Sequence, residues 1–497
     1  MSLGRVIRGS IWLSLGAVFA NFFGFIYWLF VSAVVSPVTV GRAATVLGVE
    51  SLLLSTLSLG IPIGVIRFLG KEYGEKNNFM LSEYFYSSFF FTLSLDVLAG
   101  IFLLIAGLSG GSFFLLDSES LIFAAVLTFL GLNGWPQVII ALFNSILETE
   151  YIAFVQFITG VIRLCIGIPL VYVGLGFVGI MLGYVVAASC NALTLLFLAK
   201  SRLHRLGGRL AVSSSAILES LKAGLATWIP SVLTLSGQWL GILGLSGIVG
   251  SYETGTYFIA YAITSGLLAF ALSIMNLMFP VLSGMTDGRK RAMGKAVRIS
   301  ASVVYPIAFI LILYPSLIPS ILGKSYLEAS IIISVLSAGF LLAPPVNGYM
   351  YYVYALGDYR EVILIGLAGN IPRLVLYYFL IVAYGEVGAA IAFSLGFFSS
   401  LIAVVSLSKK RGYHLDLKNI GLLAAIPGLI SLVLWATECA WIIGIPLIVG
   451  ASYLLYARFR IISKSDLREM GEAFLSKEAM VALLPYIRPL LRVLYGE

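Results

Sequence analysis

Residues 163–179 read RLCIGIPLVYVGLGFVG, and residues 373–388 read RLVLYYFLIVAYGEVG. The two stretches share an apolar pattern about 210 residues apart, and each begins with an arginine, Arg163 or Arg373, inside an apolar run of membrane-spanning length. An isolated charge at the centre of a bilayer costs about 2.5 to 3.5 kcal/mol on the insertion scale. Two arginines at such matching places therefore predict a duplicated membrane transporter.

The composition indicates the same class of protein. Of the 497 residues, 60% are hydrophobic and only 11% are charged, and the mean hydropathy is +1.03. A soluble domain carries about 25% charged residues. Nearly every apolar run is long enough to cross the roughly 30 Å hydrocarbon core as a helix, and the sequence lacks the alternating pattern of a membrane barrel. We expect an all-α polytopic membrane protein.

Fourteen apolar runs are predicted to be transmembrane helices. They cover residues 9–34, 42–66, 83–107, 119–143, 152–173, 177–199, 217–243, 255–282, 299–320, 329–355, 361–383, 387–407, 419–434 and 441–457.

The positive charges predict which side of the membrane each loop faces. Of the 31 lysines and arginines, this topology places 26 on one side, two on the other (Arg42 and Lys324) and three within helices. Short loops rich in lysine and arginine face the cytoplasm. We therefore expect a multi-pass protein of the cytoplasmic membrane with both termini inside. The net charge of +8 is then a topology signal, and no nucleic-acid partner is expected.

The repeat unit is about six helices long. Gly41 to Gly74 align with Gly255 to Gly288 at a shift of 214, and Glu150 aligns with Asp358 at a shift of 208. A unit with an even number of helices enters and leaves on the same face, so the two copies should be parallel lobes around a central cavity. The expected divisions are an N-lobe at 1–210, a C-lobe at 211–415, two helices at 416–460 and a cytoplasmic amphipathic helix on the membrane lipids at 461–497.

Three further stretches carry a family resemblance. LGIPIGVIRF at 59–68, LGKSYLEAS at 322–330 and YGEVGAAIAFS at 384–394 resemble the polysaccharide-biosynthesis (Wzx-type) flippases of the multidrug/oligosaccharidyl-lipid/polysaccharide (MOP) exporter superfamily. The resemblance covers most of residues 1–410. It implies a V-shaped pair of six-helix bundles that alternates its opening and moves a lipid-linked oligosaccharide across the bilayer for surface polysaccharide or glycoprotein synthesis. A glycosyltransferase is a candidate partner of the cytoplasmic tail.

Arg163 and Arg373 are the candidate substrate-binding residues. A polyprenyl-diphosphate sugar has a dianionic head, which needs cations in a hydrated cavity, and the planar guanidinium binds phosphate bidentately. The alternative is that each arginine braces its own lobe. Asp96 in the third helix is placed to neutralise Arg163, whereas its counterpart near Ile310 is apolar, so we expect Arg373 to be the stronger ligand candidate.

Two buried acids and two proline-bearing helices complete the candidate set. Glu50 and Asp96 either couple transport to H⁺ or Na⁺, as intramembrane carboxylates commonly do, or form fixed ion pairs. Pro136 in the fourth helix and Pro344–Pro345 in the tenth interrupt the helical backbone at corresponding places in the two repeats. They are either gating hinges or static kinks.

No catalytic, metal or cofactor site is expected. The three cysteines lack CxxC spacing, and both histidines lie in basic loops. GLGFVG at 174–179 has dinucleotide-site spacing but lacks a preceding strand, so we expect a tight turn between helices. Two other functions stay open: an ion-coupled multidrug exporter of the same superfamily, which should have an acidic cavity, and a membrane sugar polymerase or ligase, which should have a long outer loop.

Overall fold

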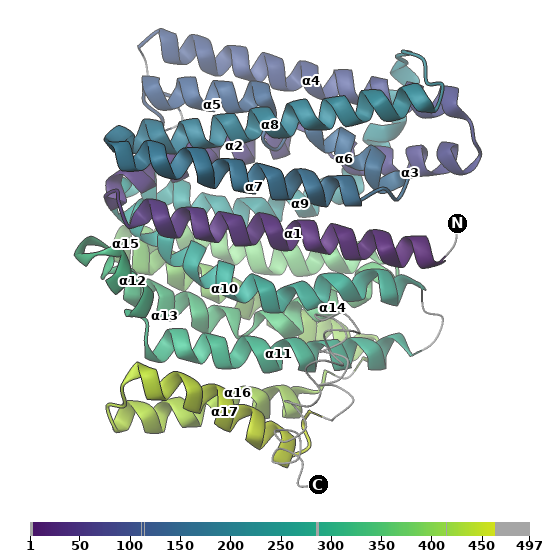
Figure 1. The fold of residues 1–497 in the computed structure, drawn as a ribbon. Coiled ribbons are helices and arrows are strands. Elements are labelled where there is room, and N and C mark those ends of the chain that lie inside the picture. Colours follow the sequence, from purple (N-terminus) through teal and green to yellow (C-terminus); the bar gives the residue numbers. More distant parts are fainter. Residues whose placement is uncertain (1–2, 111, 114, 285–287, 414, 463–497) are drawn as a thin grey trace.

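The structure is a computed structural model that describes residues 3–110, 112–113, 115–284, 288–413 and 415–462. Figure 1 shows it as a stack of elongated, nearly parallel helices. Apart from one isolated bridge between Phe113 and Leu116, the described residues form helices and turns, which confirms the all-α prediction. Of the amphipathic helix expected at 461–497, residues 463–497 lie outside the described part of the chain.

The first lobe contains six membrane crossings, of which two are broken into two helices each. Its helices are α1 (Leu3–Ser32), α2 (Pro37–Leu57), α3 (Ile61–Gly74), α4 (Asn78–Leu108), α5 (Ser118–Leu130), α6 (Pro136–Ser145), α7 (Glu150–Leu170) and α8 (Gly176–Arg205).

The break between α2 and α3 differs from the sequence prediction of one helix at 42–66. Leu59 and Gly60 have φ angles of 47° and 74°, in the left-handed region, and Pro62 stands in the first turn of α3. Glycine adopts the left-handed conformation readily, and proline is favoured in the first turn of a helix. Gly60 followed by Pro62 therefore explains the break.

The second lobe repeats this plan and is followed by two more helices. Its helices are α9 (Ser214–Ile248), α10 (Ser251–Gly284), α11 (Arg289–Leu313), α12 (Leu317–Leu322), α13 (Ala329–Phe340), α14 (Ala343–Ala355) and α15 (Tyr359–Lys410), and the two further helices are α16 (Leu417–Ala436) and α17 (Trp441–Arg458).

Two glycine turns reverse the chain inside very long helical stretches. Glu150–Arg205 and Tyr359–Lys410 contain 56 and 52 residues, which at 1.5 Å per residue is about 80 Å, far more than one bilayer core. Gly176 (φ 48°, ψ −120°) and Gly385 (φ 55°, ψ −133°) share a conformation that other residues rarely adopt. The turn predicted at 174–179 is thereby confirmed, and each stretch makes two crossings.

The number of crossings agrees with the prediction of fourteen. In the described chain, nine helices are long and apolar enough to span a membrane, and the pair α13–α14, bent by 43°, makes a tenth. The second crossings of the two long stretches add two more, and α5–α6 and α10 add one each, which brings the total to fourteen.

Helices α9 and α10 join the two lobes. α9 packs against α2, α3 and α4 of the first lobe and against α15 of the second, while α10 packs against α1 and α2. In Figure 1 the purple-to-blue helices of the first lobe lie on one side of this junction and the green helices of the second on the other. The yellow helices α16 and α17 pack on α11 at the far edge, away from the first lobe.

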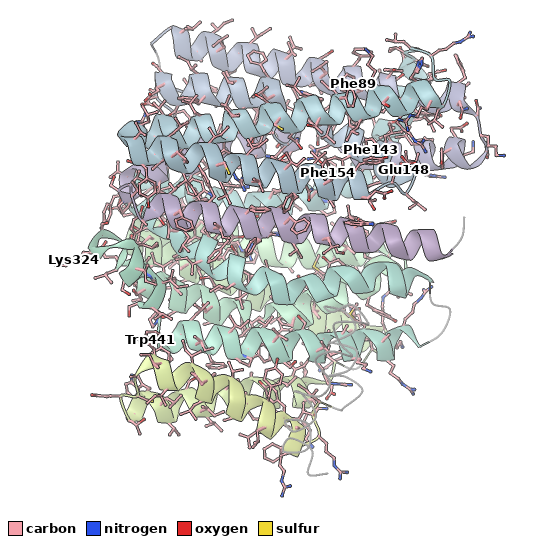
Figure 2. All side chains as sticks on the ribbon, viewed as in Figure 1. Phe89, Phe143, Glu148, Phe154, Lys324 and Trp441 are labelled. Atoms are coloured by element: carbon pink, nitrogen blue, oxygen red, sulfur yellow. The ribbon has the colours of Figure 1, made fainter. Side chains whose placement is uncertain are left out.

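Loops that were predicted to face opposite sides of the membrane lie at opposite ends of the bundle. Glu148 and Lys324 lie at opposite ends in Figure 2, and α1 starts at the Glu148 end. Ion pairs at equivalent places fasten this end of both lobes: Arg202 pairs with Glu148, and Arg411 pairs with Asp358 and with Glu361, at 2.6 Å in the latter pair.

Candidate functional site

A polar cavity of about 670 Å³ lies between the two lobes. Its wall is formed by α1, α2, α3, α6, α7, α8, α9, α10 and the breaks that follow α2 and α5. The polar and aromatic side chains of this wall are mostly tryptophans (Trp28, Trp228, Trp239), amides (Asn21, Asn133, Gln137, Gln238) and serines (Ser51, Ser55, Ser58, Ser231). Polar groups inside a membrane bundle usually mark a substrate pathway, so this cavity is the candidate site.

Arg163 is the one charged side chain in the described wall of the cavity. Its guanidinium lies over the rings of Tyr27 and Tyr184, 5.4 and 5.0 Å from their centroids. The ion pairs of the described residues do not include it, and its Nε is buried without a hydrogen-bond partner among them. Aromatic faces stabilise the cation without neutralising it, so Arg163 presents an uncompensated positive charge to the cavity.

Arg373 lies elsewhere, which differs from the sequence expectation. It is only 8% exposed and does not line the cavity. Its guanidinium packs between α9 and α15, 4.4 Å from the ring centroid of Phe393 and 5.4 Å from that of Phe397, and Nη1 donates to Asn370 Oδ1 at 3.1 Å. In this conformation Arg373 is placed as a brace, and its contact with a substrate stays a prediction.

Asp96 does not pair with Arg163, contrary to expectation. Its Oδ2 instead accepts a hydrogen bond of 2.7 Å from the backbone N–H of Trp135, at the break between α5 and α6. Glu50, which is fully buried, accepts a hydrogen bond of 3.0 Å from the side chain of Asn133 in the same break. The two predicted acids are thus brought together around one helix break.

Each of these carboxylates keeps one unused oxygen. Glu50 Oε1 and Asp96 Oδ1 are buried and have no hydrogen-bond partner among the described residues. A buried polar atom without a partner is costly, so it usually signals a proton, a water or an ion. The pair has the chemistry to take up a proton or a small cation.

The predicted hinge prolines all lie at helix breaks. Pro136 is the first residue of α6, and Pro344 and Pro345 stand in the first turn of α14, next to the 43° bend. These placements follow because proline lacks the N–H that a helix interior needs. Whether the breaks move during transport stays a prediction.

The amide groups of the wall were missed in the sequence reasoning. Asn21, Gln137 and Gln238 all lie inside apolar runs, and an amide in such a run is a readable signal because it requires hydrogen-bond partners. The tryptophans gave no comparable signal, since large apolar side chains are ordinary in membrane helices.

The cavity continues into a groove of about 420 Å³ along α1 and α10. Asn21, Trp28, Gln238, Trp239 and Phe258 line both hollows. The groove is otherwise mostly apolar or aromatic, with Phe25, Tyr261 and Phe340 among its residues. The cavity and the side groove therefore meet at a shared set of polar and aromatic side chains.

Close backbone crossings join the lobes on both sides of the cavity. On one side α2 meets α10, where a Cβ on Gly41 would lie 1.8 Å from the oxygen of Ser251. On the other side α3 meets α9, where a Cβ on Gly64 would lie 2.0 Å from the oxygen of Ser220. Only glycine fits at either place, and the wall residues of α2 and α3, from Leu47 to Ile63, lie between the two crossings.

Comparisons with known proteins agree with this architecture. A family model described as polysaccharide biosynthesis protein matches residues 63–331, more than half of the chain. A putative O-antigen transporter of Shigella flexneri is 29% identical over 155 residues, which are 30% of this chain and only 37% of that protein.

Two solved structures share the fold. The lipid II flippase MurJ, in an inward closed conformation, superposes with a TM-score of 0.72 at 15% identity, over 90% of this chain and 99% of that one. An inward-facing multidrug resistance MATE family transporter of the MOP superfamily gives 0.61 at 14% identity, over 84% and 98% of the two chains. At such identities the likeness speaks for the fold.

Proposed function

Because this chain belongs to the polysaccharide biosynthesis protein family, we propose that it is a flippase that moves a lipid-linked, polyprenyl-phosphate oligosaccharide across the cytoplasmic membrane. The observation that carries the proposal is the cavity between the lobes, whose described wall has one charged group, the cation Arg163. The phosphate head would enter the cavity and bind Arg163, because a guanidinium in a low-dielectric site attracts phosphate strongly and donates to it bidentately.

The apolar tail would remain outside the cavity. The groove along α1 and α10 opens from the cavity, and Phe25, Tyr261 and Phe340 in its wall would give the tail an aromatic surface to pack on. A substrate with a charged head and a long apolar tail fits such a pair of hollows, since the head would reach Arg163 in the cavity and the tail would contact the aromatic side chains of the groove.

Movement would follow alternating access. If the crossing of α3 with α9 separates, the cavity opens at one end, and if the crossing of α2 with α10 separates, it opens at the other. Rigid rocking of two parallel repeats around a central site is a general solution for membrane transport. The helix breaks at Pro136 and at Pro344–Pro345 would be the hinges within each lobe.

Glu50 and Asp96 would couple this movement to H⁺ or Na⁺. Both hold the α5–α6 break, and Asn133 of that break also lines the cavity. A proton or cation bound by the two carboxylates would therefore alter the wall that the substrate contacts.

The wall chemistry favours this function over export of cationic drugs. An exporter of cations should present acidic side chains to its cavity, and the described wall presents one arginine and no carboxylate. The relatives found are transporters and a flippase, which supports transport rather than the chemistry of a sugar polymerase or ligase.

We also propose an orientation for the protein in the membrane. Both termini and the basic loops would face the cytoplasm, where lysine and arginine interact with anionic membrane lipids. The product would serve surface polysaccharide or glycoprotein synthesis, with glycosyltransferases as partners on the cytoplasmic side.

Reconstitution in vesicles tests the proposal. Purified protein should move a fluorescent polyprenyl-diphosphate sugar between leaflets, measured as the fraction that becomes accessible to an impermeant quencher. A control with the Arg163→Met protein should move little. Efflux of cationic dyes without movement of the sugar lipid would favour the multidrug exporter instead.

A further inference from the structure

The charge of the cavity limits what it can hold. Its described wall carries one positive charge and no negative one, since Glu50 is fully buried behind Ser51 and bonded to Asn133. Residues 270–284, whose side chains lie outside the described set, contain no Asp, Glu, Lys or Arg. A dianionic diphosphate already exceeds the charge of Arg163. An acidic sugar would add a negative charge for which the described wall offers no second cation, which is unfavourable.

An aromatic surface faces the cavity where it meets the groove. Trp28 of α1, Trp239 of α9 and Phe258 of α10 form it, and they come from both lobes. The Phe258 ring lies edge-on to Trp28, with 4.7 Å between the ring centroids, and stacks with Trp239 at 6.4 Å. The rings hold one another in place, so the surface is rigid before any ligand arrives.

Unused amide groups lie beside these rings. Gln238 precedes Trp239 on α9, and its side chain makes no hydrogen bond among the described residues, as is also true of Gln137. Asn21 donates to the carbonyl oxygen of Ala17 at 2.9 Å and keeps its own oxygen as an acceptor. An amide can both donate and accept, which suits a hydroxyl group.

A sugar ring has an apolar face of C–H groups and a rim of hydroxyls, so it matches a flat ring bordered by amides. We infer that the cavity selects lipid-linked saccharides whose first sugars are uncharged, with Trp239, held in place by Phe258 and the nearly buried Trp28, as the stacking surface and Asn21 and Gln238 as hydroxyl partners. The inference rests on the proposed flippase function and names the part of the substrate that the cavity recognises. Arg163 on α7, whose guanidinium lies over Tyr27 and Tyr184, the two rings that also contact Trp28, would hold the adjoining phosphate.

Two substrates with the same lipid test the charge limit. Vesicles with the purified protein receive a polyprenyl diphosphate bearing either an N-acetylhexosamine or the corresponding uronic acid. We expect the neutral sugar lipid to move at least about tenfold faster, since each tenfold corresponds to a modest difference of about 1.4 kcal/mol. Equal rates, or faster movement of the acidic lipid, would overturn the inference while leaving the flippase function intact. Movement of neither would overturn the flippase function itself.

A variant tests the stacking surface. Trp239→Leu should slow the sugar lipid about three- to tenfold, as expected for one lost aromatic contact, while bare polyprenyl diphosphate should move as in the parent protein. Trp435→Leu is the matched control, because Trp435 is 68% exposed on α16, far from the cavity. If Trp239→Leu melts early, Gln238→Ala provides the same comparison. Equal slowing of the sugar lipid and the bare lipid would overturn the role assigned to these side chains.

Discussion

Arg163 and Arg373 occupy equivalent positions in the two lobes, yet one faces the cavity and the other is packed inside the protein. Both lie on aromatic rings, and Tyr184 beside Arg163 corresponds to Phe393 beside Arg373 at a shift of 209. The arginine–aromatic contact is thus common to both lobes, and access to the cavity is particular to the first. The duplication kept the cation in both lobes, and only the first lobe exposes it to the cavity.

A tyrosine and a glycine next to the arginines are exchanged between the lobes. In the first lobe the ring of Tyr27 lies where a Cβ on Gly167 would be, 2.7 Å away. In the second lobe the ring of Tyr377, the counterpart of Gly167, lies equally close to Gly241, the counterpart of Tyr27. Each hydroxyl donates to a backbone oxygen, of Ile180 or of Gly237. Each lobe thus has one tyrosine ring packed against a glycine beside its arginine, supplied by α1 in the first lobe and by α15 in the second.

The lobes also differ in acidic groups. Glu50 corresponds to Thr264 at the repeat shift of 214, and Asp96 corresponds to a position near Ile310. Among the described residues, the Thr264 hydroxyl donates to its own helix, to the carbonyl oxygen of Ala260, 2.8 Å away. The first lobe therefore holds the cation that lines the cavity and both buried acids, whereas the matching positions of the acids in the second lobe are not acidic.

The largest expected effect concerns Arg163. Arg163→Met keeps the length of the side chain and removes the charge, so transport of the sugar lipid should fall about 10- to 100-fold, as for a lost charged hydrogen bond of about 1.5 to 3 kcal/mol. The melting temperature in detergent should change little, because the side chain lines an open cavity. Arg163→Lys should recover only part of the rate, since a point charge replaces a bidentate donor.

Arg373→Met is the matched control at the equivalent position. An apolar side chain of similar volume often replaces a buried charge without loss of stability, so folding should persist and transport should stay within about threefold of the parent rate. If Arg373→Met folds normally but abolishes transport, then Arg373 contacts the substrate in another conformation and the contrast between the lobes is not functional.

A somewhat smaller effect is expected at the acids. Glu50→Gln preserves the shape and the contact with Asn133 but cannot take up a proton, so transport driven by an ion gradient should fall about tenfold with little loss of stability. Thr264→Val makes a change at the equivalent position of the second lobe and should leave the response to the gradient unaltered. A gradient response that survives in Glu50→Gln would assign the acid to holding the helix break alone.

The exchanged tyrosine–glycine pair predicts a stability effect. Gly241→Ala should destabilise the protein by about 1 to 3 kcal/mol, the usual range for overpacking, because the new methyl group meets the ring of Tyr377. Gly366→Ala on the same lobe has open space around it and should be nearly neutral. Thermal unfolding in detergent measures both, and equal melting temperatures would show that the ring can move aside.

The smallest effect is expected at the ion pairs that close the two lobes. Arg411 pairs with two acids, Asp358 and Glu361, whereas Arg202 pairs with Glu148. Arg411→Ala should therefore lower the free energy of unfolding slightly more than Arg202→Ala, by less than about 1 kcal/mol for such partly exposed pairs. The difference should be seen as a slightly lower melting temperature in detergent. The reverse order would mean that surrounding contacts outweigh the ion pairs.

The sequence was sufficient for the features that depend on counting along the chain. Apolar runs indicate the crossings, and glycine spacing indicates the turns near Gly176 and Gly385. Prolines mark the breaks near Pro136 and Pro344, although others, such as Pro230 and Pro306, lie inside helices. Counting also placed Arg163 and Arg373 inside membrane-spanning helical stretches. It could not give the direction in which each side chain points, because this depends on the rotation of a helix against its neighbours. The partner of Asp96 was unpredictable for a related reason: the free N–H of Trp135 exists only because α5 stops short of Pro136.

The glycine crossings of α2 with α10 and of α3 with α9 bear on how easily the lobes separate. A contact between two backbones contains no interlocking side chains. Its separation therefore costs little packing energy, and its formation costs little side-chain conformational entropy. Each crossing would then let the lobes separate at a low free-energy cost and would not lock them together. The equilibrium between the two openings would then be set by the ligands of the cavity and of the acids beside it. A bulky residue at Gly41 or Gly64 would keep the two helices apart at that crossing.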